Sequence, residues 1–143
     1  MSLEIFVTWL ARGRAQLKAA LAGATACTTS YLAAANHVLG VINNRSVVWN
    51  QLNASHPPAA LARTLQQTLM NAVSSSISAD RRYRAWLLQA ASTHTCPPPT
   101  GVAVYKTAAQ LDATATRAKQ RFAALFNPLA RQQHQRTWSA DEF

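Results

Sequence analysis

Few residues in this sequence have the spacing that catalysis or metal binding needs. Cys27 and Cys96 are too far apart for a Cys-x-x-Cys redox motif, and two cysteines are too few for a zinc site. Serines and threonines are frequent, but none lies in a Gly-x-Ser-x-Gly elbow, and no Gly-rich phosphate loop occurs. The sequence therefore predicts no catalytic residue and no cofactor. An enzyme whose site is assembled from distant residues is kept as an alternative.

The histidines are scattered along the chain and share no metal-ligand spacing. We expect them on the surface or in loops, with no metal bound, because a metal site needs several ligands that converge. They are His37, His56, His94 and His134.

Asp80 is the only acidic residue in a long stretch of chain, and arginines surround it. In the first interpretation Asp80 lies on a solvated helix face and pairs with Arg84 four residues later, which contributes about 0.2–0.5 kcal/mol. In the second it points inward and contacts Lys119 or the region of Asn127. A lone carboxylate with no second titratable group beside it argues against acid–base catalysis.

The two cysteines are candidates for one disulfide. When the first two helical segments fold back on each other near residue 55, the extended chain after residue 93 can bring Cys96 close to Cys27. A loop of about 70 residues would then be closed, stabilising the fold by roughly 4 kcal/mol, and the prolines after Cys96 would be pinned to the middle of the first helix. The alternative is two buried, unpaired thiols. A disulfide would indicate an oxidising compartment.

Proline and apolar periodicity predict the elements that position these residues. Apolar residues recur every three or four positions in each segment between the breaks, as in an amphipathic helix, and no strand pattern occurs. Gly23 and Gly40 could divide the first segment in two. The segments are 3–53, 58–93 and 103–127, bounded by Pro57-Pro58, by Pro97-Pro98-Pro99-Thr100-Gly101 and by Pro128.

These segments predict an all-α, antiparallel bundle of three long or four shorter helices in a single domain, 1–143. Ser55 is predicted to cap the helix that begins near the first proline pair, and Asn127-Pro128 to end the last one. Residues 1–20 extend past the second helix in this arrangement and could form a protruding helical extension. The last helix then covers their apolar side chains, or these form an exposed patch for a membrane or a homodimer; the residues are Ile5, Phe6, Trp9 and Leu10.

Charge is the one global signal of function. The 14 basic and 5 acidic residues give a net charge of +9, spread evenly along the chain, while charged residues make up only 13% of it. An even spread favours solubility and contact with anionic surfaces, such as phospholipid headgroups or wall polymers, over nucleic-acid recognition, which concentrates charge. The candidate anion-binding residues are Arg81, Arg82, Arg84, Lys119 and Arg121.

Five short motifs follow one another along the chain. They are Ser75-Ser76-Ile77-Ser78-Ala79-Asp80-Arg81-Arg82-Tyr83-Arg84-Ala85-Trp86, Cys96-Pro97-Pro98, Ala118-Lys119-Gln120-Arg121-Phe122, Asn127-Pro128-Leu129-Ala130 and Arg136-Thr137-Trp138-Ser139-Ala140-Asp141-Glu142-Phe143. Together they resemble a helical domain of unknown function found in secreted and membrane-anchored proteins of high-GC actinobacteria. The resemblance spans roughly residues 27 to 143. It implies an extracytoplasmic bundle that follows a signal peptide or transmembrane helix, and structural roles for Asp80, Tyr83, Trp86, Lys119, Phe122 and Asn127.

The sequence thus predicts a non-catalytic, extracytoplasmic interaction or sensory module, secreted or attached to a membrane through an upstream segment. Its partner would be an unidentified protein or an anionic surface. The second hypothesis is a binder of anionic polymers through distributed basic charge, with nucleic acid disfavoured because the nearby aromatic residues suit a core better than a stacking platform. The third is an enzyme with an unrecognised site.

Overall fold

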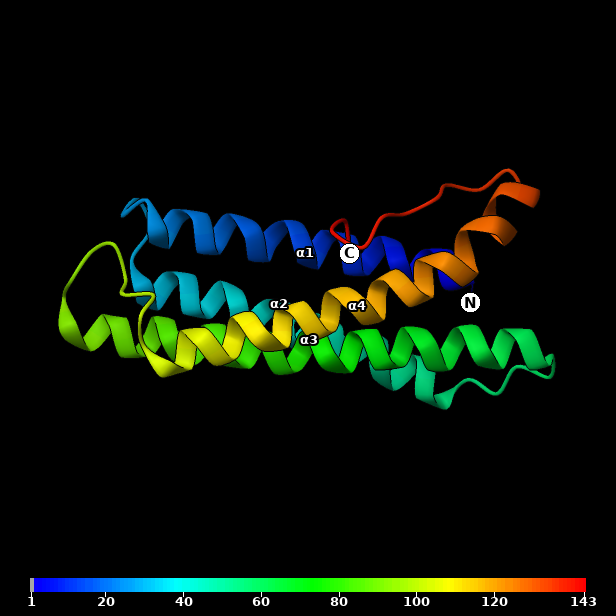
Figure 1. Ribbon diagram of the computed structural model, residues 1–143, viewed down its shortest axis with the longest axis horizontal. Coiled ribbons are helices and arrows are strands. Elements are labelled where there is room, and N and C mark those ends of the chain that lie inside the picture. The colour runs from blue at the N-terminus through cyan, green and yellow to red at the C-terminus, as the bar shows by residue number, and fades with distance from the viewer. Residues whose placement is uncertain (1) are drawn as a thin grey trace.

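The computed structural model describes residues 2–143, which form an elongated, antiparallel bundle of helices (Figure 1). No strand occurs within this range. The predicted all-α bundle is confirmed, in its four-helix form. The helices are α1 (Leu3–Thr25), α2 (Tyr31–Ala54), α3 (Ala60–Thr93) and α4 (Ala103–Gln132).

The first predicted segment is two helices, and the break lies at residues 26–30. Gly23 is in the last turn of α1, where its carbonyl accepts the Thr29 N–H at 3.1 Å and where a Cβ would collide with the Thr29 side chain. Cys27 adopts a left-handed φ of 61°, which turns the chain out of the helix. Ser30 then begins α2 by accepting the Ala33 N–H at 3.1 Å. Gly40 lies inside α2.

Two predicted helix ends are wrong. Ser55 ends α2 and does not cap α3, because the chain passes through the proline pair and a bend at residues 58 and 59 before α3 begins after Ala59. At the other boundary, α4 runs through Pro128 to Gln132. A proline removes only one backbone donor, and the turn beyond it is kept by burial of Ala130 and by the Gln133 N–H, which bonds the Leu129 carbonyl at 3.2 Å.

The core follows the apolar stripes of the sequence. α1 lies against α2, α2 against α3 and α3 against α4. Phe6 and Leu10 are buried in this core, while Ile5 is 43% exposed, so residues 3–20 lie along the bundle. A homodimer through the four N-terminal apolar residues stays a prediction. Two of them, Phe6 and Leu10, are already buried inside the protein. Representative core side chains are Leu17, Val38, Leu69, Leu87 and Phe122.

After α4, residues 133–143, here called the tail, turn back along the bundle towards its middle (Figure 1). Trp138 and Phe143 of the tail are buried, with 4% and 1% of their surface exposed. None of the helices in the described chain has a stretch that is both long and apolar enough to cross a membrane.

Candidate functional site

A disulfide closes one end of the bundle. Cys27 and Cys96 are bonded, with their Cα atoms 6.1 Å apart, as the sequence predicted. Cys27 lies in the turn after α1, so the bridge joins this turn to the segment after α3; the predicted attachment at the middle of the first helix is wrong. The reason is that the first segment is two helices. A disulfide is typical of proteins in an oxidising environment outside the cytoplasm.

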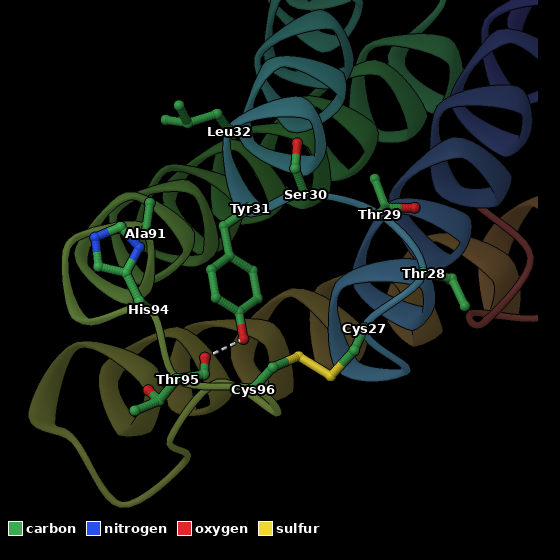
Figure 2. A pocket seen from close by; sticks show the side chains of 10 residues that line it. All are labelled: Cys27, Thr28, Thr29, Ser30, Tyr31, Leu32, Ala91, His94, Thr95 and Cys96. Carbon is green, nitrogen blue, oxygen red and sulfur yellow. Dashed lines mark hydrogen bonds between the residues drawn. A yellow bond between two sulfur atoms is a disulfide. The ribbon is translucent and has the colours of Figure 1, made fainter.

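A hollow lies beside this disulfide (Figure 2). Its volume of about 460 Å³ falls within the roughly 300–1,000 Å³ that is usual for small-molecule sites. We call it the disulfide pocket. It is lined by Cys27, Thr28, Thr29, Ser30, Tyr31, Leu32, Ala91, His94, Thr95 and Cys96.

Local bonds fix the walls of the disulfide pocket. The Tyr31 hydroxyl donates to the backbone carbonyl of Thr95, which joins the start of α2 to the segment after α3 (Figure 2). His94 ends α3 in the left-handed conformation, with φ at 52°, and so turns the chain towards Cys96. The Tyr31 bond and the disulfide cross the same gap. The pocket is therefore built from both connections at this end of the bundle.

The lining offers hydrogen bonds and a small apolar surface but no carboxylate, guanidinium or ammonium group. The Thr28 and Tyr31 hydroxyls each donate to a backbone carbonyl and keep an oxygen lone pair that can accept from a ligand. The His94 imidazole has one donor and one acceptor when it is neutral. Leu32 is 60% exposed at the rim. Such a surface suits an uncharged, polar molecule.

A second polar cluster lies inside the bundle. The Asp80 carboxylate is buried and its Oδ2 is 3.2 Å from Nε of Arg45 on α2, so the interpretation that it pairs with Arg84 on a solvated face is wrong. The two atoms are not aligned for a hydrogen bond, so the contact is an ion pair only. Burial raises the pKa of Asp80, and the Arg45 charge opposes that rise. Arg45 was visible in the sequence as the one charged residue on the apolar stripe of its segment.

Lys119 belongs to the same interior cluster. Only 3% of it is exposed, and its Nζ lies 5.8 Å from the centre of the Phe143 ring. Burial, followed by the charges of Arg45 and Arg14, lowers the pKa of Lys119 to about 7. The side chain of Ser76 is also buried there, and its hydroxyl has no hydrogen-bond partner.

The aromatic residues that the resemblance singled out pack in the interior. The ring centres of Trp86 and Tyr105 are 4.7 Å apart. The Trp86 Nε1–H donates to the Pro99 carbonyl at 2.8 Å, and this bond ties the proline segment to α3. Tyr83 lies 6.2 Å from Tyr105, and burial raises its pKa to about 12. Phe122 is fully buried and stacks on Phe126 with ring centres 5.2 Å apart.

Asn127 joins α4 to the tail. Its Oδ1 accepts the Trp138 N–H at 3.0 Å, and its Nδ2 donates to the Trp138 carbonyl at 2.8 Å. One side chain therefore satisfies both backbone groups of a buried residue, as a strand neighbour would. Nothing in the helical periodicity indicates this contact, because it depends on where the irregular tail returns.

The candidate anion-binding residues do not share one surface. Arg81, Arg82 and Arg121 are exposed, Arg84 is partly covered and Lys119 is inside the bundle. His37, His56 and His134 are exposed, and no group of three or more His, Cys, Asp or Glu side chains in residues 2–143 converges as metal ligands would.

Known proteins offer no guide to this site. No family model, curated protein or solved structure matches the chain. The disulfide pocket and the interior charges are therefore interpreted from their geometry alone. The resemblance to an actinobacterial domain stays a prediction.

Proposed function

We propose that this chain is a non-catalytic binding module that acts outside the cytoplasm and takes an uncharged, polar ligand in the disulfide pocket. The observation that carries the proposal is the pocket itself, a hollow of about 460 Å³ with covalently joined walls and a lining of hydroxyls, an imidazole and a leucine. Preformed walls favour binding because less conformational entropy is lost when the ligand enters.

The extracytoplasmic part of the proposal is supported by the disulfide, since such bonds persist in oxidising compartments. Secretion, or attachment to a membrane through an upstream segment, is what the resemblance to the actinobacterial domain would add. Mass spectrometry of the protein isolated from its source with thiols blocked at lysis tests this part. Two blocked thiols in the freshly isolated protein would count against it.

Binding can be tested by NMR with small neutral probes. We would add trehalose, maltose and N-acetylalanine methylamide separately to ¹⁵N-labelled protein. The expected result is that at least one probe shifts the amide signals of Thr28, His94 and Thr95 in a saturable way. The variant His94→Ala should weaken this response, and His56→Ala should not, because it changes an exposed histidine that follows the far end of α2. Saturable shifts confined to another part of the bundle would contradict the assignment.

A second candidate function is contact with anionic polymers. The exposed positions of Arg81, Arg82 and Arg121 and the net charge of +9 favour it. Retention on heparin should then fall steeply with salt, because each cation that meets a polymer charge displaces a counter-ion. Replacing the three arginines by glutamine would abolish this retention. Unchanged retention would exclude these residues as the binding surface.

A further inference from the structure

Lys119 lies beneath the tail without an acidic partner. Its ammonium is covered by the Phe143 ring, and Phe143 itself is only 1% exposed. Three ion pairs occur in the part of the chain that the structure describes, and none of them includes Lys119. Buried lysines are rarely left in this state, because an unpaired charge away from water is costly.

The charges around Lys119 balance only when its amine is neutral. Every helix contributes one charged side chain that influences it: Arg14 from α1, Arg45 from α2, Asp80 from α3 and Asp112 from α4. These are two cations and two anions. The side-chain carboxylates of the tail are used elsewhere, since the Ser139 hydroxyl donates to Asp141 at 2.6 Å and Glu142 pairs with Arg136 at 3.0 Å. A proton on Lys119 therefore adds a positive charge that no further side-chain carboxylate compensates.

Little water reaches this group while Phe143 is in place, because only 3% of Lys119 is exposed. The gap lined by Arg45, Ser76, Lys119 and Phe143 has no room for a water molecule. Nη2 of Arg45 and the Ser76 hydroxyl also face the interior without a hydrogen-bond partner. Solvent would reach these two groups and more of the Lys119 amine if the Phe143 ring moved away.

The tail is the part of the fold that can move without unfolding a helix. The first residues of the tail stay bonded to α4, where the Gln135 N–H donates to the Ala130 carbonyl at 2.8 Å. Beyond residue 135 two contacts attach the tail backbone to the helices: the pair of hydrogen bonds between Asn127 and Trp138, and a bond of 3.0 Å from the exposed Lys18 Nζ to the Asp141 carbonyl. The rest of its attachment is burial of two aromatic side chains. Segments held by so few backbone bonds open at a lower free energy than helices do.

We propose that the tail is a pH-sensitive strap, closed over the bundle while Lys119 is a neutral amine and released when Lys119 takes up a proton. In the closed state the pKa of Lys119 is about 7, and in an open, solvated state it returns towards the ordinary lysine value of 10.5. The open state therefore binds the proton more tightly. Between these two values opening takes up a proton, so the opening equilibrium constant rises about tenfold for each pH unit by which the pH falls, and it levels off below pH 7.

Hydrogen exchange of the Trp138 amide measures this opening, because that amide donates to Asn127 in the closed state. Exchange rates would be corrected with an unstructured peptide of the tail sequence. The expected result is an opening equilibrium constant about 50-fold larger at pH 7 than at pH 9, because half of the closed-state amines already carry a proton at pH 7. In Lys119→Met, which keeps the length of the side chain but not its amine, this dependence should vanish.

Two control variants should retain the dependence. Lys106→Met removes an exposed lysine of the same helix, and His134→Gln removes the one imidazole within the tail. An opening constant that does not vary between pH 7 and 9, or a dependence that persists in Lys119→Met, would overturn the proposal. If Lys119→Met does not fold, an NMR titration of the Lys119 side chain in the unmodified protein decides instead: a midpoint near 7 supports the strap, and one near 10.5 overturns it.

Discussion

The bundle is closed in two places by different means. At the disulfide pocket, a covalent bond and short polar side chains join two connections around an uncharged hollow. Along α1 and α4, the tail is held by hydrogen bonds and two aromatic side chains over a cluster of buried charges. A covalent closure produces a fixed site, whereas a noncovalent closure over titratable groups can open. For this reason we propose ligand binding at the disulfide pocket and pH-dependent opening at the tail.

The largest effect should come from the interior charges. Asp80→Ala leaves Arg45 buried without its partner, and we expect the free energy of unfolding to fall by about 3–5 kcal/mol. Urea denaturation followed by circular dichroism measures this. Asp112→Ala is the matched control, because its pair with Arg14 is longer, 3.6 Å, and partly exposed, so about 1 kcal/mol or less is expected. Equal losses in both variants would mean that the buried pair contributes no more than a surface pair.

Removal of the disulfide should cause the second-largest loss of unfolding free energy. The variant with both Cys27→Ala and Cys96→Ala should lose about 2–4 kcal/mol, since the unfolded chain is no longer constrained by the 69-residue separation of the bridge. The change should broaden NMR signals around the disulfide pocket and leave exchange of the Trp138 amide at pH 9 unchanged. A reductant should reproduce the loss in the unmodified protein and have no effect on the variant. Loss of the tail contacts in the variant would show that the two closures are coupled.

The disulfide end was predictable because its determinants are local. Prolines mark where helices stop, and two cysteines with no metal or redox spacing leave few alternatives, so a bridge near the proline segment followed from chain geometry. The position of Cys27 in a turn, and not inside a helix, did not follow, because the first helix ends through a turn that glycine and threonine form together. The hydroxyl lining of the pocket depends on that turn and was equally hidden.

The interior cluster of Arg45, Asp80 and Lys119 could be predicted from the sequence only in part. Helical periodicity gives the face on which a residue lies, and Arg45 lies on the apolar stripe of its segment, but periodicity does not say which faces meet. The inward interpretation of Asp80 gives it Lys119 or the region of Asn127 as a partner, whereas the ion pair is made with Arg45 of a different helix. The return of the tail over Lys119 is a long-range contact of an irregular segment, for which the sequence carries no periodic signal.

The smallest of the three effects should come from Asn127, and it bears directly on whether the tail opens by itself. Asn127→Ala removes both hydrogen bonds to Trp138, and we expect tail closure to weaken by about 2 kcal/mol, seen as roughly thirtyfold faster exchange of the Trp138 amide. The helices should keep their stability, because the lost bonds lie outside them. Asn71→Ala, which changes an exposed asparagine of α3, should leave this amide unaffected. The pH dependence should persist in Asn127→Ala, since Lys119 is unchanged, and its loss would show that the pH response depends on the hydrogen bonds of Asn127.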